Sequence, residues 1–350
     1  MKKLIISTKE QFGYLTDTFK YCEYLNSKYD ITYICLDDKL KKMEIDNINV
    51  IYVKKTKKLW LNLIKLNYYT ILNTYKINAD ILFLVYNPLI FITRLLTYGK
   101  RSILDIRTGN VDNNRIKRKK ANRRILINSK VFKEITVISE GLANLLNIKK
   151  YNVLPLGADI NQNNSNKKYE GIDLIYIGAL NNRNIIDTID GFKMFSEKND
   201  IKSRYRIIGF FKDEKSDEAV EFYKAIEKCD KIEFLGRKTH SELQKYLDES
   251  NIGISYIPIT EYYNVQPPTK TFEYLANGLA CIATNTTENR KIIEKHNGIC
   301  CSDNPKSFYN ALEDITKIKD SFNSEEIKES IREYDWKYII NNILTNIIEK

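Results

Sequence analysis

Short apolar runs rich in Ile, Val, Leu and Tyr alternate with longer amphipathic or basic stretches along the whole chain. This alternation is typical of βαβ units, in which helices join parallel strands. Six runs in the first half predict strands: KLIIS, DITYICL, NVIYVK, DILFLVY, RSILDIR and EITVIS. Five more follow: DLIYIGA, RYRIIGF, KIEFLG, IGISYIP and GLACIAT. The pattern predicts an α/β protein with two doubly wound, Rossmann-like sheets in tandem.

The stretch DINQNNSNKKYEG, residues 159–171, separates the two series of strands. It has no hydrophobic periodicity and is rich in Asn, as expected of a linker. A chain of 350 residues also suits two domains, because 100–200 residues per domain is usual. We therefore predict a first domain over residues 1–163 and a second over 164–332.

The end of the chain, SIREYDWKYIINNILTNIIEK, predicts one more helix over residues 333–350. Trp336, Ile340, Leu344 and Ile347 fall on one helical stripe, which needs a surface to pack on. The stripe alone leaves two choices open. This helix either caps its own domain or crosses back to the first.

The composition is that of an ordinary globular protein, with 43% hydrophobic and 29% charged residues. Its six cysteines form no C-x-x-C pair, which indicates reduced thiols in a cytoplasmic protein. The net charge of +11 is uneven: residues 1–160 hold 29 Lys and Arg against 14 Asp and Glu. A basic first half favours an anionic partner.

Several classes of protein are disfavoured. The chain has no G-x-G-x-x-G after a strand and no G-x-x-x-x-G-K-[ST], which argues against a dinucleotide oxidoreductase and a P-loop NTPase. Its two histidines, His240 and His296, are far apart, and no D-x-D pair ends a strand, so we expect no metal site. The most apolar segment, residues 81–93, is shorter than the roughly 20 residues that span a bilayer.

The stretch PPTKTFEYLANG, residues 267–278, places a lysine in the first turn of a predicted helix. Pro267 or Pro268 starts the helix, and Gly278 is the expected left-handed residue after its end. A cation there opposes the helix dipole by about 0.3–1 kcal/mol. A bound anion would reverse that sign, because backbone N–H groups and the Lys270 ammonium would both face it. The alternative is a surface ion pair between Lys270 and Glu273.

This stretch resembles the donor segment of the retaining GT-B glycosyltransferases of family 4, P-x-K-x-x-E-Y-x-A-x-G-x-P-V-I-A. Other segments are similar to those of the same family: VISEGLANLL, NVLPLGADI, LIYIGALNNRNIIDTIDGF, FLGRKTHSEL and DWKYII. The resemblance covers about the last two thirds of the chain. It implies the GT-B fold: two Rossmann-like domains facing each other across a cleft, the first binding acceptor, the second binding donor, and the last helix returning to the first domain.

The resemblance also assigns roles. Glu273 would hold the donor ribose hydroxyls, and Lys270 and Arg183 the donor diphosphate, in place of a metal ion. Arg237 and Lys238 would frame the base. The full implied donor set is Gly13, Gly178, Arg183, Arg237, Tyr263, Asn264, Thr269, Lys270, Thr271 and Glu273. From the residues alone, a solvent-facing helix cap is the preferred explanation of Arg183.

The chain departs from the family pattern at three places. The position eight before Glu273 is Val265 rather than Glu, and the nearby Glu261 has a different spacing. The glycine-rich loop after the first strand retains only Gly13, and the first domain lacks histidine. Asp105 and Arg107, at the end of the strand RSILDIR, are the remaining catalytic candidates. Asp105 would act as proton acceptor or loop anchor, and Arg107 would meet acceptor pyrophosphate or support the donor. Structural pairing of the two explains the pattern as well.

Two basic runs, residues 54–58 and 115–124, lie in the first half. They are either solvated charge or attract anionic lipid head groups, which would suit a peripheral membrane protein with a membrane-held acceptor. Aromatic residues are not interleaved with them, so we expect no nucleic-acid partner.

The expected activity is transfer of a sugar from a nucleotide-diphosphate donor to a hydroxyl of a glycan or lipid-linked glycan in polysaccharide synthesis. As the resemblance implies, it is a hexosyltransferase-type activity, retaining, without metal or other cofactor. The rivals are another GT-B enzyme, such as an epimerase or phosphorylase, and a catalytically silent partner that binds nucleotide sugar or glycan.

Overall fold

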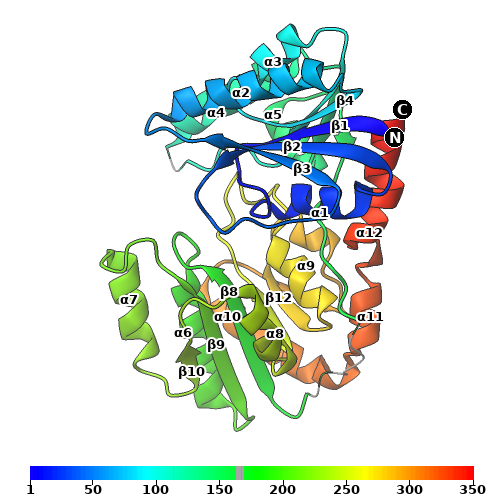
Figure 1. Cartoon of the computed structure of the whole chain (residues 1–350). Helices are drawn as coiled ribbons and strands as arrows, with labels where there is room; N and C mark the ends of the chain where they lie inside the picture. Colours follow the sequence, from blue (N-terminus) through cyan, green and yellow to red (C-terminus); the bar gives the residue numbers. More distant parts are fainter. Residues whose placement is uncertain (113, 163–166, 168) are drawn as a thin grey trace. The chain divides into compact units, whose positions relative to one another are not determined.

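The computed structural model describes residues 1–112, 114–162, 167 and 169–350. The chain forms two compact units: Met1–Leu156 together with Trp336–Lys350, and Gly157–Asp335 (Figure 1). The domain boundary predicted at residues 163 and 164 falls outside the described residues.

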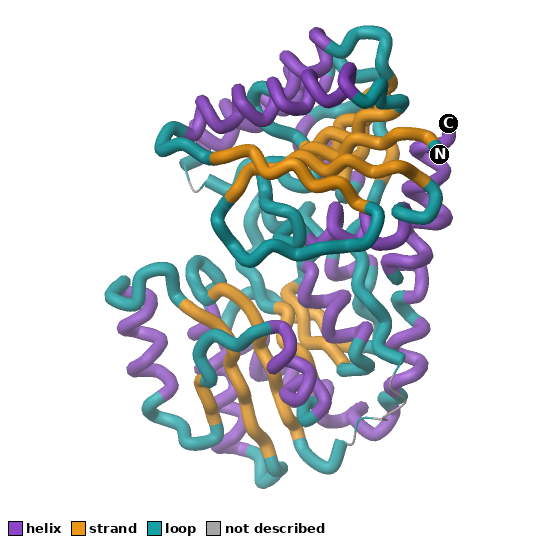
Figure 2. The backbone as a smooth tube through the Cα atoms, in the orientation of Figure 1, coloured by secondary structure: helices purple, strands orange, loops and turns teal. Residues whose placement is uncertain are grey.

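The first unit is built on a seven-stranded sheet in which every neighbouring pair is parallel, in the order β3-β2-β1-β4-β5-β6-β7 (Figure 2). All six strands predicted in this half form, and β7 adds a short seventh. The bounds are β1 Lys2–Ser7, β2 Tyr29–Asp37, β3 Ile48–Lys54, β4 Ile81–Val85, β5 Arg101–Ile106, β6 Glu134–Val137 and β7 Asn152–Val153.

Helices cover both faces of this sheet. Their bounds are α1 Thr16–Leu25, α2 Leu59–Lys76, α3 Ile90–Leu96, α4 Arg115–Ser129 and α5 Glu140–Leu146. Helix α3 packs against both α2 and α4, and these three lie on one face of the sheet, with α1 on the other (Figure 1).

The C-terminal segment belongs to the first unit. It consists of α12 Trp336–Tyr338, a π-helical stretch Ile339–Leu344 and α13 Thr345–Glu349. Trp336 is 2% exposed and lies edge-on to Tyr21 of α1, with ring centroids 6.2 Å apart. The apolar stripe predicted from the sequence is buried in the core shared by α1, β1 and β2, so the segment does cross back to the first unit.

The second unit contains a six-stranded parallel sheet in the order β10-β9-β8-β11-β12-β13. The five predicted strands form, and a sixth, β13, lies in the short run GICC, which was not predicted to be a strand. The bounds are β8 Ile172–Ala179, β9 Ser203–Phe210, β10 Ile232–Phe234, β11 Ile252–Ser255, β12 Ala280–Thr284 and β13 Gly298–Cys301.

Helix α6 packs against α7 and α10 on one face of this sheet, and α8 and α9 cover the other (Figure 1). The helices are α6 Ile185–Lys198, α7 Asp217–Ile226, α8 His240–Asp248, α9 Thr269–Ala276, α10 Pro305–Ile318 and α11 Ser324–Glu329, with 3₁₀ turns at Asn289–Lys291, Lys319–Ser321 and Arg332–Tyr334. Strand β8 lies between β9 and β11, so the strand order reverses there. Open α/β sheets bind ligands at the carboxyl ends of strands at such a switch point.

Among the described residues, no helix is both long enough and apolar enough to cross a bilayer.

Candidate active site

Helix α9 has the ends that its sequence predicts, with one difference. Pro268 is the N-cap in extended conformation, and Thr269 rather than a proline is the first helical residue. Gly278 has φ +69°, donates its N–H to the Leu275 carbonyl, and is followed by the bond from Leu279 N–H to the Tyr274 carbonyl. This is a Schellman motif, which stops the helix after about two turns. At its other end, the first turn of α9 lies beside the carboxyl ends of β8 and β11.

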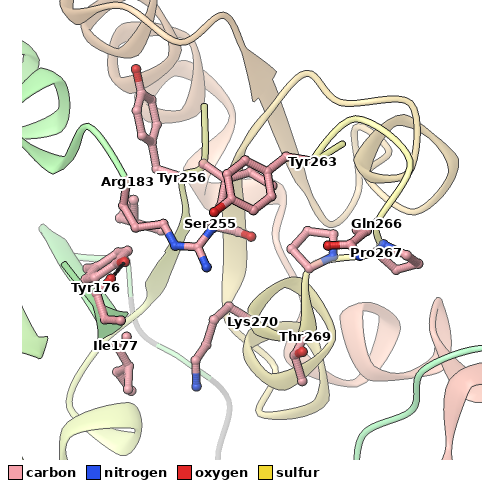
Figure 3. A pocket seen from close by; sticks show the side chains of 15 residues that line it. Tyr176, Ile177, Arg183, Ser255, Tyr256, Tyr263, Gln266, Pro267, Thr269 and Lys270 are labelled. Atoms are coloured by element: carbon pink, nitrogen blue, oxygen red, sulfur yellow. Dashed lines mark hydrogen bonds between the residues drawn. The ribbon is translucent and has the colours of Figure 1, made fainter. Parts of the chain in front are cut away.

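A pocket of about 290 Å³ opens at this first turn. It is lined by the ends of β8 and β11, by Arg183 and Tyr263, and by residues 266–270 (Figure 3). The pocket therefore lies at the topological switch point of the second sheet. Five of the predicted donor residues line it: Gly178, Arg183, Tyr263, Thr269 and Lys270.

Arg183 is held over an aromatic ring. Its guanidinium carbon lies 4.7 Å from the centroid of Tyr263 (Figure 3). Asn182 and Asn184 on either side have φ 56° and 52°, a left-handed conformation that Asn tolerates better than most residues. The tight connection between β8 and α6 thus turns Arg183 into the pocket. This geometry argues against the alternative that Arg183 is simply a solvent-facing cap.

Lys270 and Glu273 form an ion pair on α9, with Nζ 2.5 Å from Oε2. Their side chains are 32% and 42% exposed, so the pair contributes little to stability. Lys270 lines the pocket, whereas Glu273, one turn further along, is not among the lining residues. The structure combines the two alternatives that the sequence left open. Lys270 and Glu273 form the surface ion pair, and Lys270 also lies at the positive end of the helix, where it lines the pocket.

Two predicted donor residues point elsewhere. Thr271 is fully buried, and its hydroxyl bonds to Ser255 Oγ and Asn289 Oδ1, both at 2.8 Å. Asn264 uses Oδ1 to accept the N–H of Thr287 at 2.8 Å. These contacts tie α9 and the Tyr263 loop to the segment after β12. The two side chains support the pocket rather than line it.

The remaining candidates of the second unit lie outside the described lining. Arg237 is exposed and lies 4.8 Å above the ring of Phe210, and Lys238 follows it. Glu261 lies in the turn just before Tyr263. Gly178, in contrast, does line the pocket, and it lies so close to the next strand that a Cβ on Gly209 would lie 2.3 Å from its carbonyl oxygen.

In the first unit, Arg107 is engaged by protein groups. It donates to Asp17 Oδ2 at 2.6 Å and to the Leu154 carbonyl at 2.7 Å, and its side chain is 8% exposed. Burial alone would lower the pKa of the guanidinium, but the Asp17 and Asp105 carboxylates hold it raised. Asp17 and Leu154 are distant in sequence, so no sequence pattern pointed to this pairing.

Asp105 is fully buried beside Arg107. Its Oδ1 accepts the Thr136 hydroxyl at 2.7 Å and lies 3.8 Å from Arg107 Nη1, while Oδ2 has no partner among the described residues. Burial raises the pKa of this carboxyl to about 6, against the opposing effect of Arg107. These contacts favour the loop-anchor reading of Asp105 over proton acceptance from a substrate.

A second pocket, of about 360 Å³, lies in the first unit at the carboxyl ends of β4 and β5. Its lining includes Lys9, Glu10, Arg107 and Arg124. Gly13 is not among the described lining residues. It has φ +91°, and a Cβ there would lie 2.3 Å from Met43 Sδ. Its conformation and the close approach of Met43 explain why glycine is needed at this turn.

Comparisons with known proteins agree with this geometry. Residues 171–317, most of the second unit, match the family model described as Glycosyl transferases group 1. Among curated proteins no sequence matches the chain significantly.

Solved structures match over the whole chain. Sucrose-phosphate synthase from Thermosynechococcus elongatus superposes with a TM-score of 0.78 at 12% identity, covering 100% of this chain and 99% of that one. Anabaena HepE in complex with UDP gives 0.74 at 10% identity, covering 100% of both chains. The lipopolysaccharide outer core galactosyltransferase WaaB gives 0.72 at 14% identity, covering 100% and 99%. At these identities the likeness establishes the fold.

Residues 171–317 thus match a glycosyltransferase family model, and the chain as a whole has the GT-B fold of these solved glycosyltransferases. The matched domain lies in the second unit and agrees with the transferase class that the resemblance of the donor segment implies.

Proposed function

We propose that the protein transfers a sugar from a nucleoside diphosphate donor to a hydroxyl of a glycan or lipid-linked glycan in cell-surface polysaccharide synthesis. The observation that carries this proposal is the pocket of the second unit, where Arg183, Lys270 and the first turn of α9 lie together. Two cations and a helix N-terminus are what a diphosphate requires.

The same groups suit the chemistry of transfer. The bond between the sugar C1 and the diphosphate breaks as the acceptor oxygen bonds to C1, and negative charge grows on the leaving diphosphate, whose departing oxygen takes the proton of the acceptor hydroxyl. Fixed cations beside that charge stabilise the transition state. We therefore propose that Arg183 and Lys270 take the role of a metal ion, with retention at C1 as in the family that the donor segment resembles.

The residues that line the pocket suggest which side chain would contact each part of the donor. Thr269 would contact the diphosphate with its hydroxyl, and Tyr263 would face the sugar. Glu273 would hold the ribose hydroxyls, which requires its ion pair with Lys270 to open. Asn264 and Thr271 would act through their support of the pocket. For the nucleoside of the donor we propose uridine, because HepE was solved with UDP.

A saccharide acceptor is supported by WaaB, which its title names as a galactosyltransferase of the lipopolysaccharide outer core. We propose a cytoplasmic location, and we propose that the basic runs 54–58 and 115–124 attract an anionic membrane surface. Each cation near such a surface contributes about 1 kcal/mol.

The alternative is a catalytically silent partner that binds nucleotide sugar or glycan. It is favoured by the ion pair that occupies Lys270 and Glu273, and by the lack of a first-domain histidine and of the first family glutamate.

The first experiment is a thermal-shift panel of UDP, GDP, ADP, CMP and dTDP at millimolar concentration, in EDTA and in magnesium. A ligand at 100 times its Kd stabilises the folded state by about 2.7 kcal/mol. If one nucleoside diphosphate raises the Tm more than the others, and by the same amount in EDTA as in magnesium, this supports the proposed metal-free site and identifies the base of the donor. Turnover of the matching nucleotide sugar by the isolated protein then separates the enzyme from the silent partner, and no shift with any of the five would overturn the donor site.

A further inference from the structure

Helix α2 of the first unit has its apolar side turned outward. Trp60, Ile64, Tyr68 and Leu72 follow one another at intervals of four residues, and they are 56%, 43%, 59% and 46% exposed. Such residues share one face of a helix. A surface helix of a soluble protein normally presents the opposite arrangement, with its apolar stripe against the core.

The buried side of α2 is largely polar. Besides Leu63 and Leu66 it consists of Asn62, Asn67, Thr70, Asn73 and Thr74. These side chains are hydrogen-bonded within the unit: Thr70 to Ser7 at 2.8 Å, Asn67 Nδ2 to Asn87 at 3.1 Å, and the Thr93 hydroxyl to Asn67 Oδ1 at 2.6 Å. Because the polar side makes its hydrogen bonds inside the unit, these bonds set the orientation of α2 and leave its apolar side exposed.

The exposed apolar surface continues onto α3 and α4. Tyr75 donates its hydroxyl to the Leu96 carbonyl at 2.6 Å, and Arg94 Nε donates to the Val131 carbonyl at 3.3 Å, which joins the three helices. Of the 21 exposed large hydrophobic side chains among the described residues, 14 lie between Leu59 and Val131. An apolar surface so concentrated marks an interaction site.

Charge decides which partner fits. Between residues 47 and 133 the chain has 19 Lys and Arg but only three acidic residues, Asp80, Asp105 and Asp112. Of these, Arg107 and Asp105 face each other with side chains 8% and 0% exposed, so the remaining charge is still strongly positive. Isologous pairing of two copies would bring these like charges together, which is unfavourable. An anionic surface with an apolar layer beneath it complements both features.

We propose that the outward face of α2, continued by α3 and flanked by the cations of α4, binds an anionic phospholipid membrane with Trp60 and Tyr68 inserted at the interface. Trp and Tyr are enriched at this depth because their rings are apolar with one polar atom. The proposal deepens the membrane attraction in the proposed function, and it is independent of the donor pocket. The cations attract the surface, whereas the aromatic face enters it.

The chain carries its own probe, since it has two tryptophans and the second, Trp336, is 2% exposed. With vesicles of phosphatidylcholine and phosphatidylglycerol in equal parts, Trp60 emission should shift to the blue and be quenched by brominated acyl chains. The Trp60→Phe variant should bind these vesicles while losing the shift. Binding without any shift in the native protein would overturn insertion.

A double variant tests how much Trp60 and Tyr68 contribute to the affinity for vesicles. Trp60→Ser with Tyr68→Ser should lower the vesicle partition coefficient by about tenfold or more, because two apolar side chains leave the interface. The matched control is Val220→Ser with Tyr338→Ser, which removes two side chains that are 42% and 39% exposed elsewhere. Both variants should keep the native Tm and the native affinity for UDP.

Two outcomes would contradict the proposal. If the native protein sediments as a dimer, the Trp60→Ser, Tyr68→Ser variant sediments as a monomer, and neither of them binds vesicles, the outward face of α2 is an interface between copies of the chain. If both double variants lose partitioning equally, the α2 face is not the contact. Loss of UDP binding with vesicle binding intact would instead count against the donor site alone.

Discussion

Arg183 lies over the ring of Tyr263, with 4.7 Å between the guanidinium carbon and the ring centroid, although 80 positions separate the two in the sequence. Both line the pocket at the first turn of α9. The ring fixes the direction of the guanidinium without using any of its N–H donors, so these remain available to a diphosphate.

Replacing Arg183 by Ala should therefore weaken UDP binding by roughly 10- to 100-fold, the usual effect of losing hydrogen bonds to a charged group. Tyr263→Phe should bind nearly as the native protein does, because the π-face is kept, whereas Tyr263→Leu should lose several-fold. Isothermal titration measures all three. Arg204→Ala, which removes an exposed arginine paired with Asp173, is the control, and an equal loss in that variant would remove the case for Arg183.

Lys270→Ala should lower kcat/KM by roughly 100-fold, because in the proposed function the ammonium faces charge that develops on the leaving diphosphate. Its ion pair with Glu273 is more than a third exposed on the acidic side, so thermal stability should hardly change. Steady-state turnover and a melting curve together check both statements.

The control for Lys270 is Lys317→Ala. Lys317 and Asp314 form an ion pair with the same i,i+3 spacing on α10, at 2.8 Å, and neither lines the pocket. Its removal should leave turnover unchanged. Turnover of Lys270→Ala within a few-fold of native would defeat the site assignment.

The sequence predicted what is locally determined. Each predicted strand is a short apolar run bounded by polar residues, and each formed. The end of α9 at Gly278 was also predictable, because a left-handed residue after a helix is nearly always Gly or Asn. The pattern of PPTKTFEYLANG likewise placed Lys270 in the first turn of a helix.

The orientation of individual side chains could not be predicted, because it depends on contacts with residues that are distant in the sequence. Thr271 is next to Lys270 in the motif, yet a helix turns by about 100° per residue and carries it into the core. Helix α2 has an apolar and a polar stripe, and only the bonds to Ser7, Asn87 and Thr93 decide which one is buried. Arg107 likewise finds Asp17, 90 residues earlier.

Asp105 gives the fold a pH dependence of unusual sign. Its pKa is about 6 in the folded protein against 3.8 for an ordinary Asp side chain, so the folded state binds more protons than the unfolded state between these values. The contribution of Asp105 to stability is then full below about pH 4 and falls as the pH rises to about 6.

Asp105→Asn should flatten this part of the stability profile, while the bond that Oδ1 accepts from Thr136 can be kept by the amide oxygen. Chemical denaturation at intervals between pH 4 and pH 7 measures the slope. Asp112→Asn, an exposed control on the following loop, should leave the native slope in place. A native slope in Asp105→Asn would show that other groups produce it.

Trp336 joins the last residues of the chain to the first unit, so its loss should be costly. The ring is 2% exposed and packs edge-on against Tyr21, within the core cluster of α1 and β1. Trp336→Ala should lower the free energy of unfolding by about 3–5 kcal/mol, from lost burial and the cavity left behind.

The control is Tyr338→Ala, two residues later and 39% exposed, which should lower the free energy of unfolding far less. Because the pocket proposed to bind the donor lies in the second unit, the affinity for UDP below the unfolding transition should stay native in both variants. Urea denaturation followed by far-ultraviolet circular dichroism, with UDP titration of the same samples, checks both statements. Equal destabilisation by the two substitutions would mean that the C-terminal segment is not anchored through Trp336.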